Sequence, residues 1–339
     1  MSLNMTEIAD LCGVCRQTVS AVLNGKKWVS AATRENVLRV VEEQGFHPNR
    51  LALQLQNQTT NMIGVVIRDL CNPFYMQMVQ GICDVVQPAG LHLLLVDSHD
   101  DRTEEASAVS TMLSYRVRGI IMAPIQIADD HRHLMSVSKQ TSFVTIGEVP
   151  GINSACVNID DELAGALSAK YMLSHGHRHI GYMSGPSTQT HSSRRLAGFA
   201  RVYQRATGGC EPLVKYPGTD SDEQVGMALE LLKATPRPTG VVCYNDLLAI
   251  SVYRAAQILK LRIPDDVSVI GCDDIMASGL LGPPLTTVVW PVRQIGRCAA
   301  EMLLAQQSSG RHSKKKNEGP VLFKPTIIER ESVIKLVTQ

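Results

Sequence analysis

The first sixty residues carry a spacing of apolar positions that predicts short helices. The apolar positions of the first two helices are Ile8, Ala9, Leu11, Val14, Val19, Val22 and Leu23. Thr6 can cap a first helix that ends near Cys12, and Gly13 permits a sharp turn after it. A second helix is expected from about Cys15 to Leu23, because its apolar residues recur at helical spacing. Two helices joined by so short a turn indicate a helical hairpin.

A third helix is expected after Ser30, whose hydroxyl group suits an N-cap position. Val37, Val40 and Val41 give this helix an inner face. Gly45 is expected to end it, because glycine accepts the left-handed backbone that closes a helix. Three short helices with a tight turn between the first two make a helix-turn-helix unit.

From Met62 onward the pattern changes, and strand-like apolar runs alternate with amphipathic helical segments. The apolar runs are MIGVVI, HLLLVD, GIIMAP, SFVTIG, HIGYMSG, TGVVCY and VSVIGC. Such alternation predicts parallel sheets covered by helices. The runs form two cycles with a break near 153–161. The predicted fold class is therefore α/β, with a helix-turn-helix head and a body of two lobes separated by a cleft.

Composition narrows the function classes. Apolar residues make up 44% and charged residues 19% of the chain, as in an ordinary globular protein. No apolar run approaches the length of a membrane span, and the start MSLNMTEIAD lacks the apolar core of a secretory signal, so a cytoplasmic protein with reduced cysteines is expected. The net charge of +1 does not by itself indicate nucleic acid.

The head nevertheless has the residues that a DNA-binding helix needs. In a helix-turn-helix unit the second helix enters the major groove, and its exposed positions are expected to be Arg16, Gln17, Ser20 and Ala21. Arginine pairs with guanine and glutamine with adenine through two hydrogen bonds. Side chains placed to hold phosphates are Thr18, Lys26, Ser30, Thr33 and Arg34. The alternative is a small helical subdomain with a solvated polar face.

The segment HPNRLALQLQNQTTN connects the head to the body. Asn49 can start a helix with a small apolar face formed by Leu51, Ala52 and Leu55. A helix of two turns is too short to stand alone in water, so it is expected to form with a partner or on DNA. Two Leu55 side chains paired across a dimer could then wedge into a minor-groove step and bend the DNA. The alternative is a plain interdomain linker. Asn49 and Leu55 are therefore candidate DNA-binding residues. Asn24, at the end of the second helix, is a further candidate.

Neither metal nor cofactor chemistry is expected. Cys12 and Cys15 are spaced as a metal or redox pair, but no second pair of ligands lies nearby and no strand precedes them. The three histidines of HGHRHI follow a helix and lead into a strand, which favours a helix end over a metal site. No dinucleotide or Walker loop and no nucleophile elbow occurs, so the chain is not expected to be an enzyme.

Polar residues just beyond the predicted strands are candidates for a ligand site, because ligands of parallel sheets bind at the carboxyl ends of the strands. These candidates are Asn72, Tyr75, Asp97, Ser98, Glu148, Arg195, Asn245, Asp246, Asp273 and Asp274. Their amides and carboxylates suit the hydroxyl groups of a sugar, Arg195 adds a fork of donors, and Phe74 can stack on an apolar ring face. Taken singly, each is better explained as a helix cap or a surface residue.

The residues quoted above resemble a known family. The stretches MTEIADLCGVCRQTVSAVLNG, VSAATRENVLRVVEEQGFHPNRLA, IGVVIRDLCNPFY, RRLAGF, CYNDLLAI, IPDDVSVIGCDDI and PPLTTV resemble lactose-repressor-type (LacI/GalR) transcription regulators over nearly the whole chain. VIRDL, PFY and CYN are similar to maltose-system regulators of that family. The resemblance implies a repressor that binds a palindromic DNA operator as a homodimer. It also implies a periplasmic-binding-protein-like body that binds a small effector, expected to be a sugar or sugar phosphate.

Family positions can be transferred to this chain residue by residue. Recognition-helix positions fall on Arg16, Gln17 and Ala21, and the hinge wedge falls on Leu55. Effector positions fall on Phe74, Tyr75, Arg195, Asn245 and Asp273, with Trp290 as a further pocket wall. Ala21 replaces a larger polar residue common in the family, which puts one base contact in doubt. Gly147 stands where an acidic residue often meets the ligand, so Glu148 is the candidate for that role.

The pattern and the resemblance together divide the chain. The head is expected at 1–47, the hinge helix and linker at 48–61 and the effector-binding and dimerisation body at 62–339. The first lobe is expected at about 62–159 and 291–320, and the second at about 160–290 and 321–339. A two-lobed sugar transport protein and a two-domain enzyme are the competing functions. The transport protein would need an export signal, and the enzyme would need a nucleophile, a metal or a cofactor loop.

Overall fold

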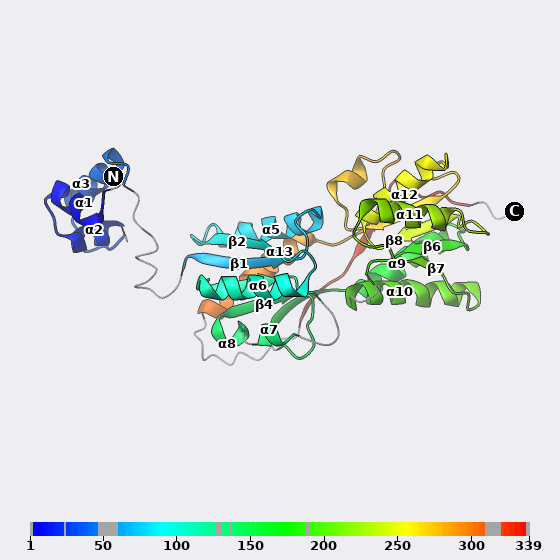
Figure 1. Cartoon of the computed structure of the whole chain (residues 1–339), viewed down its shortest axis with the longest axis horizontal. Coiled ribbons are helices and arrows are strands. Elements are labelled where there is room, and N and C mark those ends of the chain that lie inside the picture. Colours follow the sequence, from blue (N-terminus) through cyan, green and yellow to red (C-terminus); the bar gives the residue numbers. More distant parts are fainter. Residues whose placement is uncertain are drawn as a thin grey trace. The chain divides into compact units, whose positions relative to one another are not determined.

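The computed structural model describes residues 3–23, 25–46, 60–125, 131–135, 137–152, 154–186, 190–308 and 320–336. These residues belong to two compact units, a head at 1–60 and a body at 61–339 (Figure 1). Within the described ranges, every helix is too short or too polar to cross a membrane. Asn24 and most of the expected hinge segment, including Asn49 and Leu55, lie outside the described residues.

The described part of the head contains α1 (Met5–Cys12), α2 (Arg16–Leu23) and α3 (Ala31–Glu43) around a small core. Ile8, Val19 and Val37 are fully buried at its centre, one from each helix. Gly13 adopts the left-handed backbone, with φ of 66°, that the turn between α1 and α2 requires. The predicted helix-turn-helix arrangement is confirmed.

The first helix has a different cap from the one expected. The side chain of Asn4 accepts hydrogen bonds from the backbone amides of Thr6 and Glu7, and Glu7 accepts one from the Asn4 amide. This reciprocal capping box starts the helix at Met5, so Thr6 lies within the first turn and is not the cap. Ser30 caps α3 as expected, through a 3.2 Å bond from the Thr33 amide.

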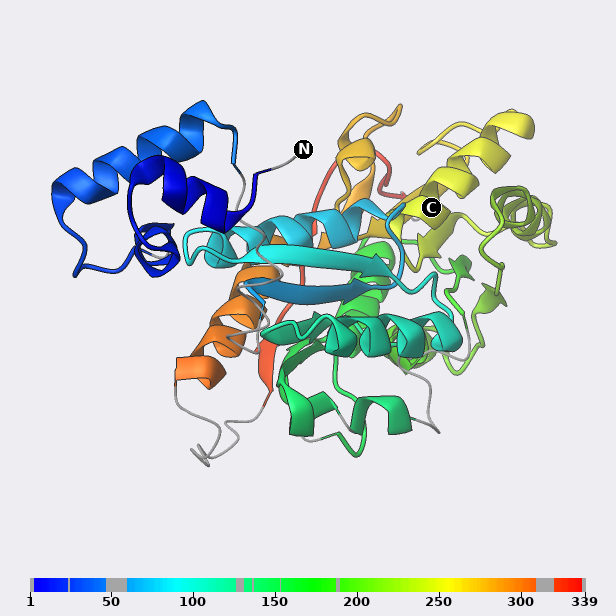
Figure 2. The same cartoon turned by 60° about the vertical axis from the view of Figure 1, so that its left-hand side comes forward.

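The first lobe of the body is a parallel sheet with helices on both faces. Its strands are β1 (Met62–Ile67), β2 (His92–Asp97), β3 (Gly119–Met122), β4 (Ser142–Ile146), β5 (Ala155–Ile159) and β11 (Val321–Phe323), in the order β11-β5-β4-β3-β1-β2. Helices α5 (Pro73–Val86) and α13 (Val292–Ser308) cover one face, and α6 (Arg102–Ser114), α7 (Arg132–Met135) and α8 (Val137–Gln140) cover the other (Figure 2). Along β1, Ile63 and Val65 pack towards α5 and α13, whereas Val66 packs towards α6.

The second lobe repeats this plan. Its strands are β6 (Ile180–Met183), β7 (Leu213–Lys215), β8 (Gly240–Cys243), β9 (Ser268–Cys272), β10 (Thr286–Val289) and β12 (Thr326–Ile328), in the order β12-β10-β9-β8-β6-β7. Only β12 is antiparallel to its neighbour among these described strands. Helices α9 (Asp161–Ser174) and α10 (Thr190–Thr207) pack on one face, and α11 (Ser221–Leu232) and α12 (Asp246–Ile258) on the other.

The two-lobed α/β class is therefore confirmed, and all seven apolar runs contain strands. The expected break near 153–161 contains strand β5 instead, which pairs with β4. In the described residues the chain crosses between the sheets after β5, after β10 and after β11. The last crossing is at Lys324 and Pro325, a few residues beyond the boundary expected near 320, because β11 pairs with β5 of the first lobe.

Glycines allow the paired helices of each lobe to touch. A Cβ atom on Gly198 of α10 would lie 1.9 Å from the carbonyl oxygen of Glu162, and one on Gly165 of α9 would lie 1.8 Å from that of Arg195. In the first lobe a Cβ atom on Gly81 would lie 2.0 Å from the carbonyl oxygen of Arg293. Side chains at these positions would force the helix backbones apart.

We predict that Gly198→Ala destabilises the protein by about 1–3 kcal/mol, because overpacking must shift α10 away from α9. The matched control is Gly226→Ala in α11, where nothing lies within 4 Å of the added Cβ atom. This substitution should stabilise the helix by about 0.5–1 kcal/mol. Urea unfolding followed by circular dichroism measures both changes. Equal stabilities of the two variants would contradict the close helix contact.

Candidate functional site

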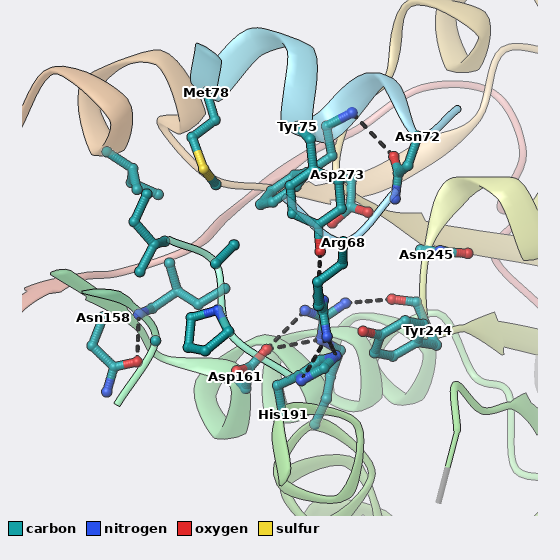
Figure 3. Close-up of a pocket in the computed structure, with 18 residues that line it drawn as sticks. Arg68, Asn72, Tyr75, Met78, Asn158, Asp161, His191, Tyr244, Asn245 and Asp273 are labelled. Carbon is teal, nitrogen blue, oxygen red and sulfur yellow. Dashed lines mark hydrogen bonds and ion pairs between the residues drawn. The ribbon is translucent and has the colours of Figure 1, made fainter. Parts of the chain in front are cut away.

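A pocket lies between the two lobes of the body, where the carboxyl ends of both sets of strands meet. It contains about 680 Å³ of empty space, including space open to solvent, which is within the range of small-molecule sites. The first lobe lines it with Arg68, Asn72, Phe74, Tyr75, Met78, Ala123, Pro124, Ile146, Gly147, Asn158, Ile159 and Ile295. The second lobe lines it with Asp161, His191, Arg195, Tyr244, Asn245 and Asp273 (Figure 3).

Six of the nine expected effector-binding residues line this pocket. They are Asn72, Phe74, Tyr75, Arg195, Asn245 and Asp273. Asn72 and Asn245 are also helix caps: their side chains accept bonds from the amides of Phe74 at 3.0 Å and Leu248 at 2.9 Å. The cap and the pocket explanations, which the sequence offers as alternatives, therefore apply together. Capping fixes each amide group at the pocket edge.

Three expected residues do not line the pocket. The carboxylate of Asp97 accepts bonds from the amides of Leu70 at 2.8 Å and His99 at 2.7 Å, and so holds two loops. Glu148 is exposed. Trp290 is 2% exposed and lies behind the lining, with the Arg195 guanidinium carbon 5.5 Å from the centre of its ring. It supports Arg195 from behind and does not form a pocket wall.

Asp246 and Asp274 follow strands as expected, but both bind other parts of their own lobe. The buried Asp246 carboxylate accepts bonds from the Ile275 amide, the Ser278 hydroxyl and the Thr287 hydroxyl, at 3.0, 2.6 and 2.7 Å. Burial raises the pKa of Asp246, and these three bonds oppose that rise. Asp274 accepts a 2.7 Å bond from Arg330. Both carboxylates fix the loop that carries Asp273.

Arg195 is held in place by a buried ion pair. Its Nη2 and Nε atoms donate to Oδ1 of Asp161 at 2.7 and 3.2 Å, and Nη1 donates to the Tyr244 carbonyl oxygen. Arg195 is 5% exposed and Asp161 is 6% exposed. Burial raises the pKa of Asp161, and the charge of Arg195 opposes this rise. The guanidinium also lies 4.5 Å from the centre of the Tyr244 ring.

Asp273 enters the pocket from a strained turn after β9. Its φ angle is 117°, in a region that side chains other than glycine rarely adopt. Burial raises the pKa of Asp273 to about 7, against the opposing charge of Arg195. Near neutral pH a fraction of this carboxyl group is therefore protonated, and the protonated form can donate a hydrogen bond.

Five charged or polar lining residues were not expected from the sequence: Arg68, Asn158, Asp161, His191 and Tyr244. Arg68 directly follows β1 and Tyr244 directly follows β8, so the strand-end rule could have found them. His191 lies four residues before Arg195 on α10, so helical spacing puts the two side chains on one face. Asp161 starts α9, after the strand that the sequence analysis missed.

The head presents the expected polar side chains only in part. Arg16 and Gln17 are exposed on the first turn of α2, and Lys26 is exposed after it. Thr18, Ser20 and Thr33 are half-buried, and Ser30 is exposed. Ala21 was expected on the exposed face, but it is 6% exposed and packs in the core of the head. Its methyl group therefore faces the other helices.

Arg34 was expected to hold a phosphate, but its guanidinium bonds to the chain itself. It donates to the carbonyl oxygens of Val22 and Lys26 and so fixes the loop that follows α2. The Cys15 thiol interacts with the Thr18 hydroxyl at 3.2 Å and takes the place of a serine cap. Hydrogen bonds that the Thr18 hydroxyl and backbone amide donate to the sulfur lower the pKa of this exposed thiol.

Comparisons with known proteins agree with both parts of the structure. Residues 4–49 match the model of bacterial regulatory proteins of the lacI family, and residues 169–333 match that of a periplasmic binding protein-like domain. The chain is 30% identical to the HTH-type transcriptional repressor PurR of Vibrio vulnificus. The alignment spans 332 residues and covers 97% of this chain and 98% of the relative. The corresponding repressor of Vibrio atlanticus is also 30% identical, over 96% of this chain and 97% of the relative.

Solved structures give the same result. The lac repressor dimer bound to operator and the anti-inducer ONPF matches with a TM-score of 0.84 and 25% identity, over 98% of this chain and 100% of that one. A complex of the transcriptional regulator CelR with cellobiose matches with a TM-score of 0.71 and 26% identity, over 97% and 99% of the two chains. The relatives named here are regulators and not enzymes, as expected for this chain. The chain therefore belongs to the lacI family of bacterial regulatory proteins, and it is a DNA-binding transcriptional repressor controlled by a small-molecule effector.

Proposed function

We propose that the protein binds a two-fold symmetric operator as a homodimer, and that an effector in the pocket between the lobes changes its affinity for that operator. The observation that carries the proposal is the presence of a helix-turn-helix head and a two-lobed body with a lined pocket in one chain. The likeness to a lac repressor dimer on its operator supports the symmetric assembly. Because the operator is DNA inside the cell, the proposal includes a cytoplasmic location.

The head acts through two kinds of contact. Arg16 and Gln17 are exposed at the start of α2, the end that enters the major groove in this motif, and they bind base edges. Ser20 on the same helix belongs to this base-facing set. Lys26 and Ser30 are exposed and bind phosphates together with Thr18 and Thr33. Asn24, Asn49 and Leu55, which lie outside the described residues, remain in the proposed DNA-binding set on sequence grounds.

The effector is a sugar or a compound of similar polarity. Asn72, Asn158 and Asn245 present amide groups, and Asp161 and Asp273 present carboxyl groups, which together suit several hydroxyl groups. Phe74 provides an apolar ring beside them. Regulators of the same fold with bound cellobiose and with bound ribose support this chemistry. The ligand acts by shifting the balance between two arrangements of the lobes, and thereby the spacing of the two heads on DNA.

Base contacts and phosphate contacts should respond differently to mutation. We predict that Arg16→Ala costs about 1–3 kcal/mol of operator affinity and relaxes the base preference at one position. Lys26→Ala should weaken binding to all sequences alike and reduce the salt dependence by about one ion. Selection from randomised duplexes, followed by fluorescence anisotropy titrations at several salt concentrations, measures both effects.

The control for these variants is Lys170→Ala, which removes an exposed positive charge from the body. It should leave the selected sequence and the salt slope unchanged. Identical behaviour of the Arg16 and Lys26 variants would refute the division of roles. A folded protein that selects no duplex sequence, with or without small molecules, would refute the proposed function.

The effector pocket needs a probe that leaves the fold intact. Arg195→Ala is unsuitable, because it leaves the buried Asp161 carboxylate without its ion pair. We predict that Phe74→Ala spares operator binding and weakens the effector response about tenfold or more, because it removes the half-buried ring from the lining. Gel shifts with and without sugars measure both quantities.

Tyr115→Ala is the matched control, because this exposed aromatic residue of the same lobe lies outside the pocket. It should behave as the unchanged protein in both assays. A normal effector response in the Phe74 variant would remove Phe74 from the site.

A further inference from the structure

Arg68 and His191 meet across the pocket from opposite lobes. Arg68 follows β1 in the first lobe, and His191 lies in the first turn of α10 in the second. Nη1 of Arg68 is 3.0 Å from Nε2 and 3.4 Å from Nδ1 of the histidine ring (Figure 3). The Nε atom of Arg68 donates to the Tyr75 hydroxyl at 2.6 Å, which sets the direction of the guanidinium group. Two basic side chains thus point at each other inside a ligand pocket.

The contact between Arg68 and His191 is a weak interaction for a guanidinium group. Burial, together with the positive charges of Arg68 and Arg195, holds the pKa of His191 well below its ordinary value, so its ring is neutral. Arginine stays protonated under all ordinary conditions. The interaction is therefore one between a cation and a neutral ring. A guanidinium bound to an anion makes shorter and stronger charge-assisted bonds.

The second arginine of the pocket shows the difference. Arg195 makes two bonds to the buried carboxylate of Asp161, at 2.7 and 3.2 Å, so its charge is balanced within the lining. Arg68 instead forms a longer ion pair with Asp100, at 3.9 Å, whose side chain is 28% exposed and is not among the described lining residues. Asp273 is only partly ionised near neutral pH. Among the described residues of the lining, two arginines, Arg68 and Arg195, lie beside two carboxyl groups, those of Asp161 and Asp273.

The direction of the donors also fits an anion. Arginine has five N–H groups in a planar fork, and a neutral histidine has one N–H group. An acidic group between the lobes can accept from both residues at once, and its charge would offset the burial of Arg68 and the repulsion that His191 experiences from the two arginines. A neutral hydroxyl group in the same place would provide no such compensation.

We propose that the effector carries a carboxylate or phosphate group, which takes the place of the direct Arg68–His191 contact and is bound by both side chains. The inference rests on the proposed effector function and names the chemical class of the ligand. Because the two residues belong to different lobes, the acidic group joins the lobes through its own bonds. The remainder of the ligand faces the amide and apolar side chains of the lining.

Isothermal titration calorimetry of the full chain, without DNA, tests this with matched compounds. Glucose is compared with glucuronate and glucose 6-phosphate, ribose is compared with ribose 5-phosphate, and inorganic phosphate is titrated alone. We expect the charged member of at least one set to bind at least tenfold more tightly than its neutral counterpart. Comparison of glucuronate with the sugar phosphates shows whether the site binds a carboxylate or a phosphate. Equal or tighter binding of the neutral member in every set, or no binding of any acid, overturns the proposal.

Variants separate a ligand contact from a structural role. Arg68→Gln should lower the affinity for the charged compound about tenfold to hundredfold and reduce its advantage over the neutral one, whereas Arg68→Lys should restore part of that advantage. His191→Gln, which retains a donor, should give a smaller loss. Arg254→Gln removes an exposed arginine that bonds to Gln257 outside the pocket, and it should change nothing. Equal loss of charged and neutral ligands in Arg68→Gln would show a purely structural role and overturn the proposal.

Operator binding by the same samples separates the two conclusions. If a neutral sugar changes operator affinity and no acid binds, the proposed function stands and the acidic effector is excluded. If no duplex sequence is preferred, the proposed function fails whatever the calorimetry gives.

Discussion

The buried ion pair between Arg195 and Asp161 is the interaction on which the pocket depends. It links the start of α9 to α10 where the second lobe lines the pocket. It also holds the guanidinium group close to the rings of Tyr244 and Trp290. Such a pair offsets its own desolvation only when the geometry is good and further donors find partners, as Nη1 does here on the Tyr244 carbonyl oxygen. The glycine contacts between α9 and α10 bring the two helices close enough for this pair to form. Packing in the helix layer therefore decides the electrostatics of the ligand site.

Carboxylates around the site divide into those that build it and those that face the ligand. Asp246 is saturated by an amide and two hydroxyl groups, and Asp97 holds two backbone amides. Neither is among the residues that line the pocket. Asp273, by contrast, is presented from a strained turn that the contacts of Asp246 and Asp274 stabilise. Backbone strain of this kind persists only where the surroundings determine the conformation, and it is concentrated at functional positions.

Much of this architecture follows from the sequence alone. Local sequence patterns predict the seven apolar runs, the turn at Gly13 and the cap at Ser30, because each depends only on residues that are neighbours in the sequence. Strand β5 was missed because Ala155 and the polar Asn158 interrupt its apolar run. Ala21 was misplaced because its burial depends on how α2 packs against its neighbours. Asp97 and Asp246 follow strands as ligand residues do, and only tertiary contacts show that they bind backbone and hydroxyl groups instead.

The last crossing between the lobes limits how they can move. Two residues, Lys324 and Pro325, separate β11 in one sheet from β12 in the other. An extended chain spans at most about 3.3–3.6 Å per residue, so these two sheet edges can never separate by more than a short distance. The lobes cannot slide apart, and a rearrangement must swing about this tethered side while the far side of the cleft travels furthest. Hinge motion of this kind converts a small angular change at the ligand into a larger displacement at the surface of the body.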